Sequence, residues 1–150
     1  MNHIRCSAKA LILRDSCLLA VKCEGENKPF FILPGGGQEF GETLHQALRR
    51  ECAEELGTDV AIGKLVHIRE YIGAHHEFAH SDSHRHQTEF IFMCAVPDDY
   101  DAHMGKTPDD YQLGTEWLPI DELEDRNFYP KALCEIIRGK AAEVYLGDVN

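Results

Sequence analysis

The stretch GGGQEFGETLHQALRRECAEELG, residues 35–57, opens with three glycines and continues into a segment that has the signals of an α-helix. Thr43 and Gln46 are spaced as a capping box, so the helix is expected to begin directly after Thr43. Gly57 suits the left-handed conformation that commonly follows the last helical residue. The sequence therefore predicts a helix over residues 44–56, preceded by a glycine-rich turn.

Glutamates of this helix fall on its apolar side. Each residue rotates by about 100° around the axis, so with Leu44 at zero Leu48 lies at about 40°. Glu51 and Glu55 then lie at about −20° and about 20°, and Glu54 at about −80°, at the edge of the apolar arc. Like charges at positions i and i+4 destabilise a helix, and more so when they are desolvated. A run of charged residues usually forms a solvent-exposed helix face. The helical angles argue against that interpretation here.

Positive charge is scarce around these carboxylates. Arg50 can reach Glu54 across one helical turn, but one guanidinium cannot neutralise three carboxylates. A divalent cation would supply the missing charge most simply, and oxygen donors without Cys or His favour Mg²⁺ or Mn²⁺. The glycines at 35–37 allow close approach of the backbone, and free carbonyls there could complete a metal site, although a glycine trio is most often only a turn.

Segments on both sides of this stretch predict a sheet. Strands are expected at residues 4–14, 16–24, 29–33, 60–73 and 86–96, and a passage from strand to helix at 116–127. Residues 90–93 are apolar without alternation, which is typical of a strand buried on both faces. Leu133, Ile136 and Ile137 mark an amphipathic helix near the C-terminus. We therefore expect a sheet that is covered by helices on both faces.

Length and charge narrow the class of protein. The chain has 150 residues, which suits one domain over residues 1–150. Its net charge of −11 argues against binding to nucleic acid or to an anionic membrane surface, since both need a basic surface. The longest apolar run, residues 90–96, is too short to span a bilayer, and the N-terminus lacks the apolar core of a signal peptide. We expect a cytoplasmic protein whose six cysteines are reduced.

The spacing of glycine and charged residues from Gly36 to Thr58 resembles the Nudix box, the signature of the Nudix hydrolase family with its MutT-like members. The positions that match are Gly36, Glu42, Arg50, Glu51, Glu54, Glu55 and Gly57. Cys52 and Thr58 stand where the family prefers large aliphatic residues, which affects packing rather than chemistry. Matches at fixed spacing make this motif far more specific than a lone glycine fingerprint.

The resemblance implies a fold and a reaction. The fold is an α/β/α sandwich with a mixed β-sheet between helices. The reaction is metal-dependent hydrolysis of a pyrophosphate linkage in a nucleoside diphosphate joined to another group, with Mg²⁺ or Mn²⁺ as cofactor. The partner is a small nucleotide substrate. Nucleoside triphosphates, ADP-ribose, dinucleoside polyphosphates, nucleotide sugars and the 5′ end of a capped RNA all remain open, as does a homodimer.

The resemblance also implies roles for the residues of the box. Glu51 and Glu55 would bind the metal ion directly, and the carbonyl group of Gly36 would be a further ligand. Glu54 would also bind metal, or would orient and deprotonate the attacking water. Carboxylates on a rigid helix suit phosphoryl transfer, which asks a protein mainly for positioning and electrostatics.

Further acidic and basic residues have implied roles around these ligands. Arg50 would hold the glutamates in position, with Glu42 as its buried partner or as an accessory base. Family members often add an acidic ligand from a later loop, and Glu116 is the first candidate here, ahead of Asp110 and Glu89. Each of these three is otherwise an ordinary surface acid.

Histidines cluster in the segment HHEFAHSDSHRH, residues 75–86. His76 and His80 have the spacing of zinc ligands on a helix, but residues 81–83 indicate a loop. We therefore expect a polar hairpin loop, with contact to substrate phosphate as the alternative.

Two other kinds of function fit parts of the pattern. A nucleotide-sensing module could use the same fold without turnover, although it would not need three metal-binding glutamates. A helical interaction surface would not place its acids among the leucines. Substrate-binding residues are unknown: Tyr71, Phe78 and Tyr111 could stack on a base, but aromatic residues are more often part of a core.

Overall fold

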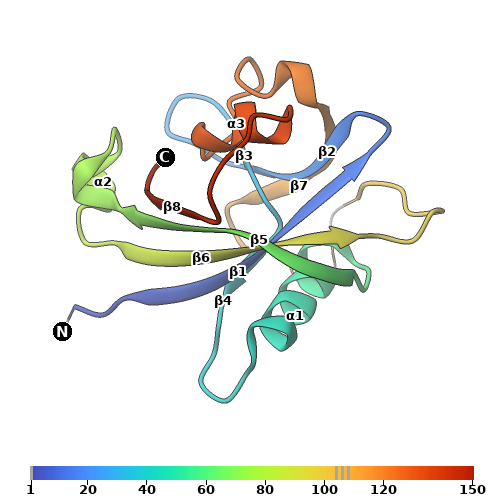
Figure 1. Ribbon diagram of the computed structural model, residues 1–150, viewed down its shortest axis with the longest axis horizontal. Helices are drawn as coiled ribbons and strands as arrows, with labels where there is room; N and C mark the ends of the chain where they lie inside the picture. Colours follow the sequence, from blue (N-terminus) through green and yellow to red (C-terminus); the bar gives the residue numbers. More distant parts are fainter. Residues whose placement is uncertain (1, 104, 106, 108) are drawn as a thin grey trace.

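The computed structural model describes residues 2–103, 105, 107 and 109–150 (Figure 1). The strands are β1 (Arg5–Arg14), β2 (Cys17–Cys23), β3 (Phe30–Ile32), β4 (Gly35–Gly37), β5 (Ala61–Ile72), β6 (His86–Ala95), β7 (Gln112–Pro119) and β8 (Tyr145–Asp148). The helices are α1 (Leu44–Leu56), α2 (Ala79–Asp82) and α3 (Ala132–Ile137), and the 3-10 turns are η1 (Gly73–His75) and η2 (Ile120–Glu122).

Strand β1 joins two parts of one mixed sheet. Residues 7–9 pair antiparallel with β4, whereas Leu13 and Arg14 pair antiparallel with β2. The other edge of β1 pairs in parallel with β6. The strand order is β3-β2-β1-β6-β5-β8, with β7 paired to β2 and β4 paired to β1. The mixed sheet predicted from the sequence is confirmed.

Helices cover both faces of this sheet, with α1 on one side and α3 on the other (Figure 1). Leu48 of α1 belongs to an apolar cluster with Ala10 and Ile12 of β1. Leu133 of α3 belongs to a second cluster with Leu11 of β1. Strand β6 contributes to both clusters, as its unbroken apolar run predicts. The predicted sandwich of helix, sheet and helix is therefore confirmed.

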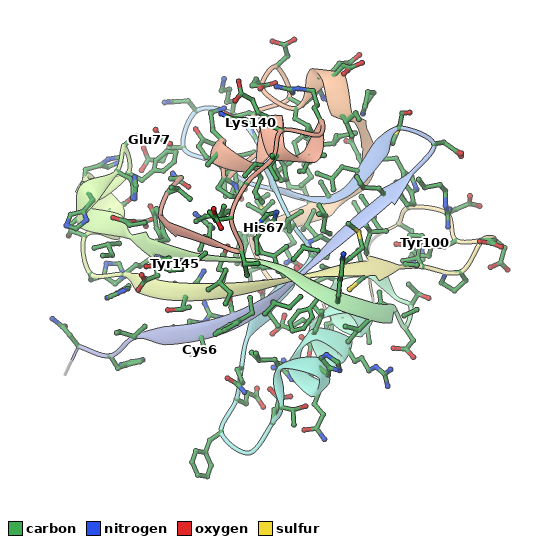
Figure 2. All side chains as sticks on the ribbon, in the orientation of Figure 1. Cys6, His67, Glu77, Tyr100, Lys140 and Tyr145 are labelled. Atoms are coloured by element: carbon green, nitrogen blue, oxygen red, sulfur yellow. The ribbon has the colours of Figure 1, made fainter. Side chains whose placement is uncertain are left out.

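Helix α1 has the bounds that its capping signals predict. The Thr43 hydroxyl accepts a hydrogen bond from the backbone N–H of Gln46, and the side chain of Gln46 accepts one from the N–H of Thr43. Gly57 follows the helix in the left-handed conformation, with a φ of 72°. At the same end, the hydroxyl group of Tyr100 (Figure 2) donates to the carbonyl of Leu56 over 2.9 Å. The helix is therefore held at both ends.

The glycine-rich turn is itself a short strand, which was not predicted from the sequence. Gly35–Gly37 form β4 and lie against β1. A Cβ atom on Gly35 would lie 2.1 Å from the carbonyl oxygen of Ala8, and its φ of +128° is one that other residues rarely adopt. Glycine therefore allows this backbone to approach β1 more closely than any other residue could.

Two further segments differ from expectation. Residues 75–86, expected as a loop, contain the single helical turn α2, in which the carbonyl of Phe78 accepts hydrogen bonds from the N–H groups of Ser81 and Asp82. Strand β8 was not predicted either, because four residues are too few to show an alternating pattern. It pairs in parallel with β5. None of the helices in the described ranges is long and apolar enough to cross a membrane.

Candidate active site

Strand β4 and helix α1 bring Gly36 and Glu51 into direct contact. A Cβ atom on Gly36 would lie 2.5–2.7 Å from the carboxylate atoms of Glu51, so this carboxylate occupies space that any other residue at position 36 would fill. Burial raises the pKa of Glu51, and the hydrogen bond from Arg50 opposes that rise. The structure thus brings together two of the residues assigned from the sequence to a metal site.

Arg50 connects the acids around β4. Its guanidinium donates two hydrogen bonds to Glu42, of 2.8 and 2.9 Å, in the fork geometry typical of arginine. It also donates to the carbonyl of Gly37 and to Glu51, each over 2.9 Å. The hydrogen bonds from Arg50 lower the pKa of Glu42 to about 2. The side chain of Arg50 therefore connects α1 with β4 and with the segment that contains Glu42.

Glu55 is almost completely buried, with 3% of its surface exposed. One carboxylate oxygen accepts a 2.7 Å hydrogen bond from the backbone N–H of Gly35, and the other accepts a hydrogen bond from the side chain of Gln112 in β7. Burial raises the pKa of Glu55 to about 7, and the positive charge of Lys9 opposes that rise. Glu55 therefore faces the interior, as the helical angles predict.

The raised pKa of Glu55 predicts a pH-dependent stability. Because the folded protein holds this proton more tightly than the unfolded chain, the contribution of Glu55 is fully present below about pH 4.5 and is lost as the pH rises through about 7. We expect the Glu55→Gln variant, which lacks this proton, to gain up to roughly 3 kcal/mol relative to the parent between pH 4.5 and pH 8. Denaturant unfolding of both proteins in EDTA measures the difference. A difference that is constant over this range would refute the assignment.

Glu54 lies at the solvent edge of the site. Its side chain is 38% exposed, and its carboxylate is 3.7 Å from the guanidinium of Arg50. This agrees with the helical angles, which put Glu54 at the margin of the apolar arc. A carboxylate in this position is accessible to water, whereas that of Glu55 is enclosed by protein donors.

Lys9 supplies a second positive charge that the sequence-based charge count overlooked. It lies in β1 with 8% of its surface exposed, and its charge acts on Glu55. Arg50 is therefore not the sole cation available to the acids of the box. Arg5 is a third cation nearby, since a Cβ atom on Gly37 would lie 2.4–2.8 Å from its guanidinium atoms. The four carboxylates of the box still outnumber these three cations.

The donors of the box suit a hard divalent cation. Its side-chain donors are carboxylate oxygens, and the carboxylate of Glu51 lies against Gly36 of β4. Within the described ranges, no three Asp, Glu, His or Cys side chains already converge as metal ligands. Glu51 turns one oxygen toward Arg50, and both oxygens of Glu55 accept hydrogen bonds. The acids would therefore exchange some of these hydrogen bonds for coordination.

Two of the acids considered for a further ligand lie away from the box. Glu116 pairs with Arg126 at 2.5 Å, and in the sheet it stands beside Ala20, which belongs to the cluster on the α3 side. Glu89 is buried and pairs with Arg69 at 2.6 Å. The structure therefore brings neither Glu116 nor Glu89 to the acids of α1.

The loop before β7 contributes residues that were missed. Asp110, the remaining candidate, is exposed in this loop, but the charge of its neighbour Asp109 reaches Glu51 and adds to the rise in the pKa of that carboxyl. Gln112, two residues further on, bonds Glu55. No local pattern marks Asp109 or Gln112. A signal did exist for Lys9, because it is a charged residue within an apolar strand.

The histidine-rich segment binds carboxylates of the protein itself. His75 and His76 contact the carboxylate of Asp148 in β8 at 2.7 and 2.6 Å. His86 contacts Glu70 of β5 at 3.1 Å. The two contacts with Asp148 fasten β8 to the turn after β5, which gives His75 and His76 a structural role.

The three aromatic residues considered for base stacking lie in different surroundings. Tyr71 stacks on His76, with 5.4 Å between ring centroids, and Phe78 packs edge-on against another aromatic ring. Burial raises the pKa of Tyr111, and the charges of Asp109 and Glu55 add to the rise. Since 46% of Tyr111 is exposed, it is the aromatic residue of the three best placed to meet a ligand.

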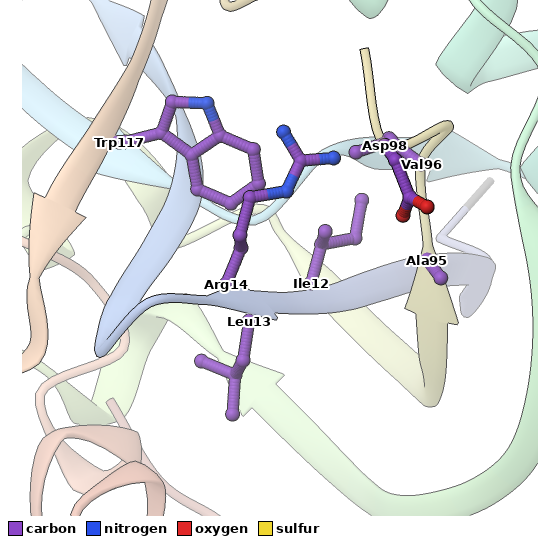
Figure 3. Close-up of a pocket in the computed structure, with 7 residues that line it drawn as sticks. All are labelled: Ile12, Leu13, Arg14, Ala95, Val96, Asp98 and Trp117. Atoms are coloured by element: carbon purple, nitrogen blue, oxygen red, sulfur yellow. The ribbon is translucent and has the colours of Figure 1, made fainter. Parts of the chain in front are cut away.

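Two surface cavities of the described residues lie away from the box. One, of about 180 Å³, lies at the end of β1, where the guanidinium of Arg14 is 4.8 Å from the ring centre of Trp117 (Figure 3). The other, of about 250 Å³, lies between residues 2–4 and residues 83–86. No acid of the box lines either cavity.

Comparisons with known sequences identify the family. A family model described as a NUDIX domain matches residues 4–136. The nucleoside triphosphatase NudI of Salmonella arizonae is 40% identical over 58 residues, which cover 37% of this chain and 41% of that protein. The match thus spans about two fifths of the length of the curated relatives.

Solved structures share the fold over most of the chain. A NUDIX hydrolase from Nitrosomonas europaea has a TM-score of 0.70 at 21% identity, covering 91% of this chain and 88% of that one. An ADP-ribose pyrophosphatase from Streptococcus suis has a TM-score of 0.62 at 20% identity, covering 96% and 98%. At these identities the likeness concerns the fold alone. Because the family model extends over most of the sequence, this chain belongs to the Nudix hydrolase family.

Proposed function

We propose that this protein is a metal-dependent pyrophosphohydrolase that cleaves a phosphoanhydride bond in a nucleoside diphosphate derivative. The observation that carries the proposal is the contact between the Glu51 carboxylate and Gly36, with Arg50 bonded to both segments. A carboxylate buried against a glycine backbone costs stability unless a partner offsets its charge. Binding of a cation at this point accounts for that arrangement. The activity named for the sequence relative, nucleoside triphosphatase, supports a phosphoanhydride substrate.

Four groups of the box are proposed to hold Mg²⁺ or Mn²⁺. They are the carboxylates of Glu51, Glu54 and Glu55 and the carbonyl of Gly36. A divalent cation held there offsets the charge of the phosphate oxygens and lowers the pKa of a water molecule. The protein supplies fixed positions for these donors, because α1 is capped at both ends and β4 is paired along β1. Positioning and electrostatics are what phosphoryl transfer mainly requires of a protein.

Glu54 is also the residue that we propose to orient and deprotonate the attacking water. It is the acid of α1 with the greatest exposure, and the nearby guanidinium of Arg50 limits its movement. Glu42 is a poor base, since its pKa is lowered to about 2 and both of its oxygens accept hydrogen bonds from Arg50. Of its two possible roles, we therefore assign Glu42 to holding Arg50.

A nucleotide panel tests the proposed function. With Mg²⁺ or Mn²⁺, the purified protein is expected to hydrolyse at least one nucleoside triphosphate, ADP-ribose, dinucleoside polyphosphate, nucleotide sugar or capped RNA. EDTA is expected to abolish this turnover. Phosphorus NMR of the products identifies the bond that breaks. Binding of a nucleotide without cleavage of any compound, under either metal, would favour the sensing module instead.

The contact between Gly36 and Glu51 gives a separate prediction. In Gly36→Ala the added methyl group would occupy the space of the Glu51 carboxylate, which must move. We expect turnover to fall by about tenfold or more, because a displacement of about 1 Å can cost on the order of 10² in rate. The Tm of Gly36→Ala is measured alongside turnover, so that a displaced Glu51 carboxylate is distinguished from a loss of folding. Normal turnover in Gly36→Ala would mean that β4 does not position Glu51.

A further inference from the structure

Lys9 is a buried lysine in the middle of an apolar strand. It lies in β1 between Ala8 and Ala10, which are completely buried, and 8% of its own surface is exposed. Burial of a charged group costs stability unless groups of opposite charge offset its desolvation. The presence of lysine at this position therefore needs a partner that explains it.

The ammonium group of Lys9 reaches the glycine strand. Its Nζ atom lies 3.4 Å from the carbonyl oxygen of Gly35 and 3.5 Å from that of Leu33. Both distances are at the long end of the hydrogen-bond range. In the register of the sheet Lys9 stands directly opposite Gly35, whose missing side chain lets the backbones of the two strands approach closely. Two long contacts to neutral carbonyls do not offset a buried charge, so an acid must contribute.

Glu55 is the acid that meets the same glycine from the other side. Gly35 accepts from Lys9 at its carbonyl and donates its N–H to Glu55 over 2.7 Å. The two charged side chains are not in direct contact, and Gly35 connects them. The charge of Lys9 opposes the effect of burial on the pKa of Glu55, which is consistent with this arrangement.

The charge of Lys9 also acts on the carboxyl group of Glu89, where it helps to lower the pKa, but Glu89 has a cationic partner of its own. The carboxylate of Glu89 lies 2.6 Å from the guanidinium of Arg69, and both side chains are buried. Loss of Lys9 would leave Glu89 paired with Arg69. Glu55, by contrast, accepts hydrogen bonds from two neutral donors, the N–H of Gly35 and the side chain of Gln112.

We propose that Lys9 is a positioning residue of the Nudix box. Its charge holds Gly35 and, through Gly35, the carboxylate of Glu55, so that β4 and α1 keep the separation at which Gly36 and Glu51 meet. Some residues orient metal ligands without binding the metal ion themselves. Substitution of such a residue commonly lowers metal affinity or activity by about 10–100-fold. The catalytic part of this inference rests on the proposed function, whereas the coupling of Lys9 to Glu55 does not.

A double-mutant cycle in EDTA tests the coupling without any need for turnover. Lys9→Met is expected to lower Tm by roughly 5 °C or more, because it leaves Glu55 buried without a compensating charge. Adding Glu55→Gln to Lys9→Met should restore much of this loss. Lys22→Met in β2 is the matched control, since the Lys22 side chain is 35% exposed. A Lys9→Met variant that fails to fold, while the double variant folds, supports the same coupling. Additive changes in Tm overturn it.

Steady-state kinetics test the positioning role. In Lys9→Met we expect kcat to fall by about tenfold or more and KM to change by less than about threefold, because the proposal assigns Lys9 to holding Glu55 rather than to binding substrate. Lys9→Arg keeps the charge and should recover part of the loss in kcat. A rise in KM at unchanged kcat, or unchanged kinetics in a folded Lys9→Met variant, overturns the proposal. If the parent turns over no nucleotide, the proposed function fails while the cycle still decides whether Lys9 and Glu55 are coupled.

Discussion

Replacing Glu51 with glutamine is expected to lower kcat by about 10²-fold or more while the protein stays folded. Glutamine keeps the size of the side chain but removes the charge that we assign to metal binding. Glu54→Gln should have an effect of similar size, because it removes the group proposed to deprotonate water. The measurement is kcat at saturating Mg²⁺ or Mn²⁺ with the best substrate of the nucleotide panel, together with Tm for each variant.

Glu135→Gln is the matched control for both substitutions. Glu135 lies in α3, on the other side of the sheet, where it pairs with Lys140 at the surface. Its variant should keep near-normal kcat. A Glu51→Gln or Glu54→Gln variant with near-normal kcat at saturating metal would show that its assigned role is wrong.

Arg50→Lys is expected to lower kcat by about 10²-fold although the charge is kept. The guanidinium of Arg50 donates at once to both oxygens of Glu42, to the carbonyl of Gly37 and to Glu51. A lysine ammonium is a compact point charge and cannot reproduce this planar fork. Glu51 would lose its fixed position against β4. A lower Tm should accompany the loss, because the acids around Arg50 lose hydrogen bonds.

Arg49→Lys provides the same substitution one residue earlier in α1. Arg49 is exposed, so its replacement should leave kcat and Tm nearly unchanged. If Arg50→Lys and Arg49→Lys have the same kcat and Tm, the hydrogen bonds of Arg50 do not position the acids. The proposed role of Glu42 in holding Arg50 is then wrong as well.

The features of the site that depend on local sequence could be predicted. The capping pair of Thr43 and Gln46 and the glycine at 57 lie within the stretch that they delimit, and the structure has α1 at the bounds they predict. The helical angles depend only on spacing, so they also indicated that Glu55 faces inward. The unbroken apolar run at residues 90–93 is also a local feature, and from it the burial of β6 on both faces could be predicted.

Features that depend on distant pairing could not be predicted from the pattern. Gly35–Gly37 form a strand only because they lie against β1, some thirty residues earlier in the chain. Gln112 reaches Glu55 from the first position of β7, and the sequence between the two residues gives no sign of the contact. Lys9 changed the charge count for the same reason. A count of the charges within α1 alone omits Lys9, which lies in β1 and acts on Glu55.

Thermal melts of the parent and of Glu55→Gln, at pH 8 in EDTA and in Mg²⁺, test the central claim that a divalent cation binds to the inward-facing acids of α1. A cation that binds only the folded protein stabilises it by about 2.7 kcal/mol at a hundredfold excess over its Kd. The parent should show a gain of this size, and the variant a much smaller one. In EDTA the variant should be at least as stable as the parent, because it lacks the buried charge. If both proteins melt alike in each buffer, Glu55 is not a metal ligand and the placement of the cation on this helix is contradicted.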